Sequence, residues 1–162
     1  MGRWRRQQTE TALRTFDEMG VFATWTRTRG GYTIHFGPND ALQFTMHHTG
    51  FFIMGISAVL TTMQKTHGAD REAFLTQIPD TVGARNGVPI ASYVPRVVRD
   101  LYSNGVISSW SATPDWKQIS ILYHDGTGFT GGLHELSAYV NGVLSAENYL
   151  MAFAFMFRDG SQ

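Results

Sequence analysis

The residues Ala41-Leu-Gln-Phe-Thr-Met-His-His-Thr-Gly50 carry the pattern on which we base the interpretation of the whole chain. Apolar and polar side chains alternate from Leu42 to His47, which is typical of a β-strand with one buried face. We therefore predict a strand over residues 41–50, with His48 on the apolar face and more buried than its neighbour. The polar face would form a binding site made of Gln43, Thr45 and His47.

Length and charge limit the class of protein. The chain has 162 residues, which predicts a single domain over residues 1–162. Thirteen basic and thirteen acidic side chains give a net charge of zero, so nothing in the overall charge attracts nucleic acid or an anionic membrane. There is no cysteine, which excludes disulfides and thiolate chemistry.

No stretch of the sequence suggests membrane insertion or export. The longest apolar run, residues 51–60, is far shorter than the roughly 20 residues that cross a bilayer. The N-terminal residues lack the apolar segment of a signal peptide. We expect a soluble, cytoplasmic protein with no membrane partner.

Hydrophobic periodicity predicts an α-β-β-β order in the first part of the chain. Thr9 would cap a helix that Gly20 ends. The predicted elements are a helix over 9–19, strands over 21–27, 32–36 and 41–50, and a helix over 51–66.

The second part repeats part of this order. A short helix from Asp70 to Pro79 and an exposed linker over 79–91 would lead into it. The final segment is apolar on both faces, which favours a central strand that buries Phe153 and Phe155. The predicted elements are a helix over 92–103, a hairpin over 106–112 and 117–123, a short helix near Leu133, and a strand over 149–157.

Two segments 85 residues apart are similar. Residues 13–26 and 98–111 share Arg, Gly, Val and Trp at matching positions, so each places a tryptophan, Trp25 or Trp110, after a glycine-terminated helix. The alternative is that any helix–glycine–strand junction gives such a match. We predict an α+β fold with an antiparallel sheet and helices packed on one face. Two related α-β-β halves, residues 9–66 and 92–157, are a further possibility within this fold.

The histidines are the first candidates for chemistry. The strand that ends in His47-His48-Thr49-Gly50 resembles the zinc-binding strand of the N-acetylmuramoyl-L-alanine amidases of phage endolysins. That resemblance implies a zinc ligand at His47, and a similar histidine–glycine loop implies a second at His124. A catalytic zinc needs three protein ligands, and the resemblance supplies no third. The alternative is that the paired histidines only form hydrogen bonds at a sheet edge.

Two further segments have a functional and a structural interpretation. Gly126-Thr-Gly-Phe-Thr-Gly-Gly could hold an anion before a helix, but it lacks the lysine of a P-loop, so we favour a flexible connection. Trp4 lies among Arg3, Arg5 and Arg6 and could stack on a nucleic-acid base. We favour a solvated helix start there.

The leading functional hypothesis is a non-enzymatic interaction or assembly module that binds itself or another protein without a cofactor. It rests on zero net charge and an abundance of aromatic and methionine side chains, which protein interfaces favour. The alternative is a zinc-dependent, amidase-like hydrolase. The third hypothesis is weak nucleic-acid binding through Trp4 and its neighbouring arginines.

Overall fold

A computed structural model describes the backbone of residues 2–65 and 94–160 and the side chains of residues 5–65 and 94–152. The N-terminal unit has a helix, a three-stranded meander and a second helix. In chain order these are α1 (Gly2–Met19), β1 (Thr24–Arg27), β2 (Gly31–Gly37), β3 (Asp40–Thr45) and α2 (Met46–Lys65).

The C-terminal unit has the same order of elements. Each unit forms its own antiparallel sheet, in the order β1-β2-β3 or β4-β5-β6. The prediction of an α+β fold with helices on antiparallel strands is confirmed, although the strands form two sheets. The elements are α4 (Val94–Ser103), β4 (Ser109–Ala112), β5 (Gln118–Leu122), β6 (Gly128–Gly132) and α5 (Leu133–Gly160).

Strand register makes the two units equivalent residue by residue. Trp25 pairs with Ile34 in the first sheet, and Trp110 pairs with Ile121 in the second. The third strands continue the same rows with Leu42 and Phe129. Positions therefore correspond with an offset of 85 residues at the first strand and 87 from the second strand onward. The two tryptophans occupy equivalent places, as expected for related halves.

The first helix of each unit ends in the same way. Gly20 and Gly105 have positive φ angles of 93° and 76°. The following amide then turns back to the helix: Val21 N donates to Phe16 O over 3.0 Å, and Val106 N donates to Leu101 O over 2.9 Å. These are the hydrogen bonds of a helix that ends on a left-handed glycine. The glycine stops predicted from the sequence are therefore confirmed.

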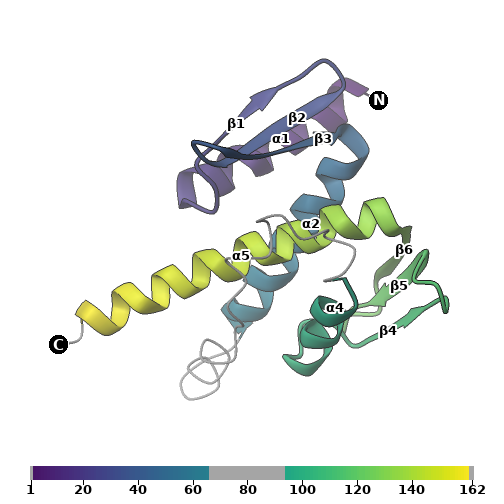
Figure 1. Cartoon of the computed structure of the whole chain (residues 1–162). Helices are drawn as coiled ribbons and strands as arrows, with labels where there is room; N and C mark the ends of the chain where they lie inside the picture. Colours follow the sequence, from purple (N-terminus) through teal and green to yellow (C-terminus); the bar gives the residue numbers. More distant parts are fainter. Residues whose placement is uncertain (1, 66–93, 161–162) are drawn as a thin grey trace.

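Helices α2 and α5 cross and join the two units (Figure 1). A Cβ atom on Gly55 would collide with the backbone oxygen of Tyr139, and one on Gly142 would collide with the backbone oxygen of Phe52. The two glycines are equivalent at the offset of 87. Each removes the side chain where the backbones approach most closely, so the crossing has an approximate two-fold symmetry.

The core extends across both units as one cluster. The inner face of each sheet contributes aliphatic and aromatic side chains, such as Tyr32 and Ile34 from β2 and Ile119 and Ile121 from β5. Residues 138–147 of α5 are all buried, so this helix contacts protein on every side. In the described part of the chain, no helix is both long and apolar enough to cross a lipid bilayer.

One predicted strand is too long, and another is wrong. The strand expected over residues 41–50 ends at Thr45, and residues 149–157 belong to α5. A continuous apolar run fits a buried strand as well as a buried helix, so periodicity alone does not separate the two. The side chains of Phe153 and Phe155 lie outside the described residues. So do the predicted 70–79 helix and the 79–91 linker, including the boundaries between the proposed halves.

Candidate functional site

His47 and His48 lie in the first turn of α2 and not at the end of a strand. Thr45 terminates the strand because its hydroxyl caps the helix: His48 N donates to Thr45 Oγ1 over 3.1 Å. In the equivalent position of the other unit, Gly132 N donates to Glu135 Oε2 over 3.0 Å. A full capping box has two such bonds, one from the N3 amide to the N-cap side chain and one from the N-cap amide to the N3 side chain. The first unit has the former bond and the second unit has the latter.

Three histidine rings from the starts of α2 and α5 lie in a row, and the first of them packs against Phe51. The His47 ring lies 5.7 Å from that of His48 and 5.1 Å from that of Phe51, and the His48 ring lies 6.5 Å from that of His134. His47 is exposed and His48 is half-buried, which is the predicted order of burial. Among the described residues, no group of three or more histidine, aspartate and glutamate side chains is arranged to hold a metal ion.

His124, the second proposed zinc ligand, lies elsewhere. Its Nε2 donates to the Gly105 carbonyl over 2.9 Å, which ties the β5–β6 turn to the end of α4. It lines a groove beside the part of α2 that starts at Met54. Since a helix rises about 1.5 Å per residue, that groove begins about 10 Å along the helix from His47. The two histidines do not form one site.

The groove containing His124 has a volume of about 530 Å³. One wall is a face of α2 with small side chains, including Ser57, Ala58 and Thr62. The opposite wall comes from Val106, after α4, and from the turn that follows β5. His124 and Asp125 lie along this second wall. Lys65 lies at the end of the α2 wall, so both walls bring polar or charged groups to the groove.

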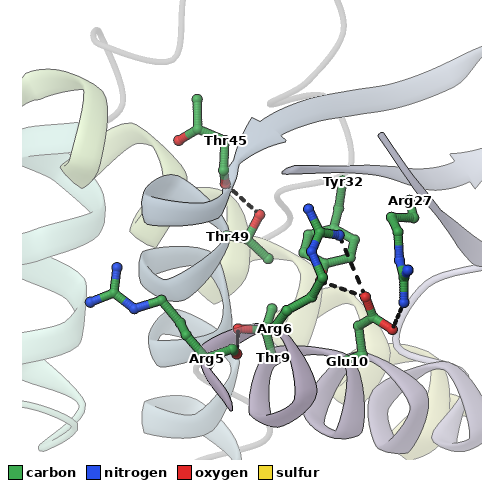
Figure 2. A network of polar contacts seen from close by, with 8 residues as sticks. All are labelled: Arg5, Arg6, Thr9, Glu10, Arg27, Tyr32, Thr45 and Thr49. Atoms are coloured by element: carbon green, nitrogen blue, oxygen red, sulfur yellow. Dashed lines mark hydrogen bonds and ion pairs between the residues drawn. The ribbon is translucent and has the colours of Figure 1, made fainter. Parts of the chain in front are cut away.

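The arginine-rich N-terminus takes part in the structure of the first unit. Arg6 Nη1 lies 3.5 Å from Glu10 Oε2, and the Arg6 guanidinium lies 5.1 Å from the centre of the Tyr32 ring. Arg5 is exposed and its carbonyl accepts a hydrogen bond from the hydroxyl of Thr9 (Figure 2). Thr9 therefore lies inside the helix and does not cap it. The side chain of Trp4 lies outside the described residues.

Glu10 is the centre of this network (Figure 2). Its carboxylate accepts hydrogen bonds from Arg27 Nη2 at 2.7 Å and from the Tyr32 hydroxyl at 2.8 Å. The hydrogen bond from Arg27 lowers the pKa of Glu10 although burial opposes the shift. Burial, together with the bond to Glu10, raises the pKa of Tyr32 to about 12. The network joins α1 to the inner face of the first sheet.

Gln43 and Thr45 lie on the outer face of the first sheet, opposite the helices. The strand pairing and the alternating burial place seven residues on that face: Thr24, Thr26, Thr33, His35, Ala41, Gln43 and Thr45. His47 belongs to a helix, so it does not continue this row. The predicted set of Gln43, Thr45 and His47 is therefore not one strand face.

The outer face of the second sheet carries no charge. Its residues are Ser109, Ser111, Gln118, Ser120, Leu122, Gly128, Thr130 and Gly132. The hydroxyls of Ser120 and Thr130 lie 2.8 Å apart, and Leu122 is 43% exposed. None of the residues of β4, β5 and β6 is ionisable. We name this surface the hydroxyl face.

Sequence reasoning missed both the groove and the hydroxyl face. The hydroxyl face could have been found, because Gln118, Ser120 and Leu122 alternate with buried isoleucines within a predicted strand. The groove could not, because its walls come from segments far apart in the chain. Comparison of the chain with protein-family models, curated proteins and solved structures finds no match.

Proposed function

We propose that the protein is a non-enzymatic assembly module that self-associates through the hydroxyl face. The observation that carries this proposal is the absence of charged side chains from all three strands of the second sheet. Depletion of charge is the compositional feature that distinguishes the centre of protein interfaces from other surface. The exposed side chain of Leu122 adds an apolar contact on the same face.

A second copy of the chain is the partner that fits this surface. Two-fold association places the same patch on both subunits, so the patch must be complementary to itself. A hydroxyl both donates and accepts hydrogen bonds, so a row of serines and threonines can pair with a copy of itself. With a net charge of zero, no overall repulsion opposes the association.

The first sheet provides an internal comparison. Thr33 is equivalent to Ser120, and His35 is equivalent to Leu122. The first sheet thus presents an ionisable ring where the second presents an exposed apolar side chain. We assign self-association to the second sheet for this reason.

Sedimentation velocity over a range of protein concentrations tests the proposal. The wild-type chain of 18.1 kDa should reach about twice that mass as the concentration rises. Ser120→Lys should remain a monomer, because two-fold pairing would bring two ammonium groups together and like charges across an interface cost several kcal/mol. Thr33→Lys, the equivalent change on the first sheet, should dimerise like the wild type. A monomeric wild type at every concentration would refute the proposal.

A further inference from the structure

The groove beside α2 is the strongest candidate for a site that self-association does not explain. Small residues of α2 form one wall, and the other wall includes Val106 and Tyr123 from the C-terminal unit. Its volume of about 530 Å³ lies within the range of roughly 300–1,000 Å³ that small-molecule pockets occupy. The groove is therefore large enough to bind a small organic molecule.

Helix α5 carries larger side chains at two positions that correspond to this wall of α2. At the offset of 87 residues, Ser57 corresponds to Leu144 and Thr62 corresponds to Tyr149. Leu144 is 1% exposed and belongs to the core. The same position of the same architecture therefore takes bulky side chains on α5 and small ones on α2. At these two positions the groove wall lacks the apolar bulk that α5 carries, whereas Met54 of the wall corresponds to the smaller Asn141.

We propose that this groove binds a small molecule with an apolar body and an anionic head group. The body would fill the space that Leu144 and Tyr149 fill at the equivalent positions of the other unit. Met54, Ala58 and Val106 provide apolar contacts for it. This inference is independent of the proposed self-association, because the groove and the hydroxyl face share no residue.

Lys65 makes the anionic head group the best fit. Lys65 lies in the last turn of α2 and lines the groove. Asp125 also lines it, but Asp125 Oδ1 accepts hydrogen bonds from the backbone amide and the hydroxyl of Thr127, at 2.9 Å and 2.6 Å. Those bonds to Thr127 hold Asp125 to its own turn and lower its pKa, and the charge of Lys65 also helps to lower the pKa of Asp125. The negative charge of Asp125 should therefore weaken the binding of an anion.

Fluorescence titration with 8-anilino-1-naphthalenesulfonate, an aromatic body with a sulfonate, tests the proposal. We expect one saturable site on the wild type. Ser57→Leu with Thr62→Tyr installs the side chains of the other unit and should abolish that site while the protein remains folded. Thr15→Leu with Thr11→Tyr adds the same two side chains at exposed positions of α1 and should leave the site intact.

Two single variants test the head group. Lys65→Gln should weaken sulfonate binding, and Asp125→Asn should strengthen it, each by roughly two- to fivefold as expected for exposed charges. N-phenyl-1-naphthylamine has the same body without the sulfonate, so neither change should alter its binding. Thr62→Tyr alone provides the steric test if the double variant does not fold. Unchanged sulfonate binding in a folded groove-filling variant would overturn the proposal, as would equal responses of the two probes to Lys65→Gln.

Discussion

Two buried glutamates illustrate how the surroundings of a single side chain decide its charge. Glu10 is 7% exposed, and three side chains stabilise its carboxylate: Arg6, Arg27 and Tyr32. Glu147 on α5 is 5% exposed. Burial raises the pKa of Glu147 to about 8, and the negative charge of Asp100 adds to the rise. The equivalent position in the first unit is Leu60, so an apolar side chain fits there.

The pKa of Glu147 predicts a pH-dependent stability. The folded state holds a proton that the unfolded chain, with its ordinary pKa of 4.5, releases earlier. Stability should therefore fall as pH rises from about 4.5 to about 8, by at most about 1.4 kcal/mol per pH unit. Urea unfolding of Glu147→Gln at several pH values should lack this decrease. The exposed Glu18→Gln serves as control, and an equal pH slope in Glu147→Gln and wild type would contradict the assignment.

At the scale of the element, sequence patterns predicted the first sheet's strands, the β4–β5 hairpin and the glycine-terminated helices. They missed β6, because the glycine-rich residues 126–132 favoured a flexible connection, and they misjudged both long helices. The alternation from Leu42 to Phe44 is that of a strand, and the strand ends at Thr45 because that side chain caps α2. Periodicity carries no information on such a cap. For α5, the continuous apolar run over residues 149–157 fits a strand as well as a helix, so the sequence pattern does not separate them.

The crossing of α2 and α5 predicts that a glycine-to-alanine substitution changes the free energy of unfolding in opposite directions at two positions of α2. Gly55→Ala should lower the free energy of unfolding by about 3 kcal/mol, because its Cβ would meet the backbone of α5, which can yield only by moving the helix. Gly50→Ala has open space around its Cβ and should raise stability by up to about 1 kcal/mol. Chemical denaturation of both variants measures the difference. Wild-type stability in Gly55→Ala would show that the helices do not approach so closely.

At the scale of the whole molecule, the two units share one architecture but differ on their surfaces. The inner strand residues are apolar in the second unit, whereas the first unit places Glu10 and Tyr32 in a polar network. On the outer sheet faces, Leu122 of the second unit corresponds to His35 of the first. On the long helices, Ser57 in the groove corresponds to the buried Leu144. The similarity around Trp25 and Trp110 pointed to this arrangement from the sequence. The candidate sites did not follow, because they depend on which faces remain uncovered after the units pack.

Self-association through the hydroxyl face can be tested by cross-linking, because the natural chain contains no cysteine. A single cysteine then reports only on contacts between its own copies. We predict that Ser120→Cys forms a covalent dimer under mild oxidation at low protein concentration, since two-fold pairing brings the two thiols close together. Thr33→Cys, at the equivalent position of the first sheet, should remain monomeric under the same conditions. Equal, slow cross-linking of the two variants would contradict the account.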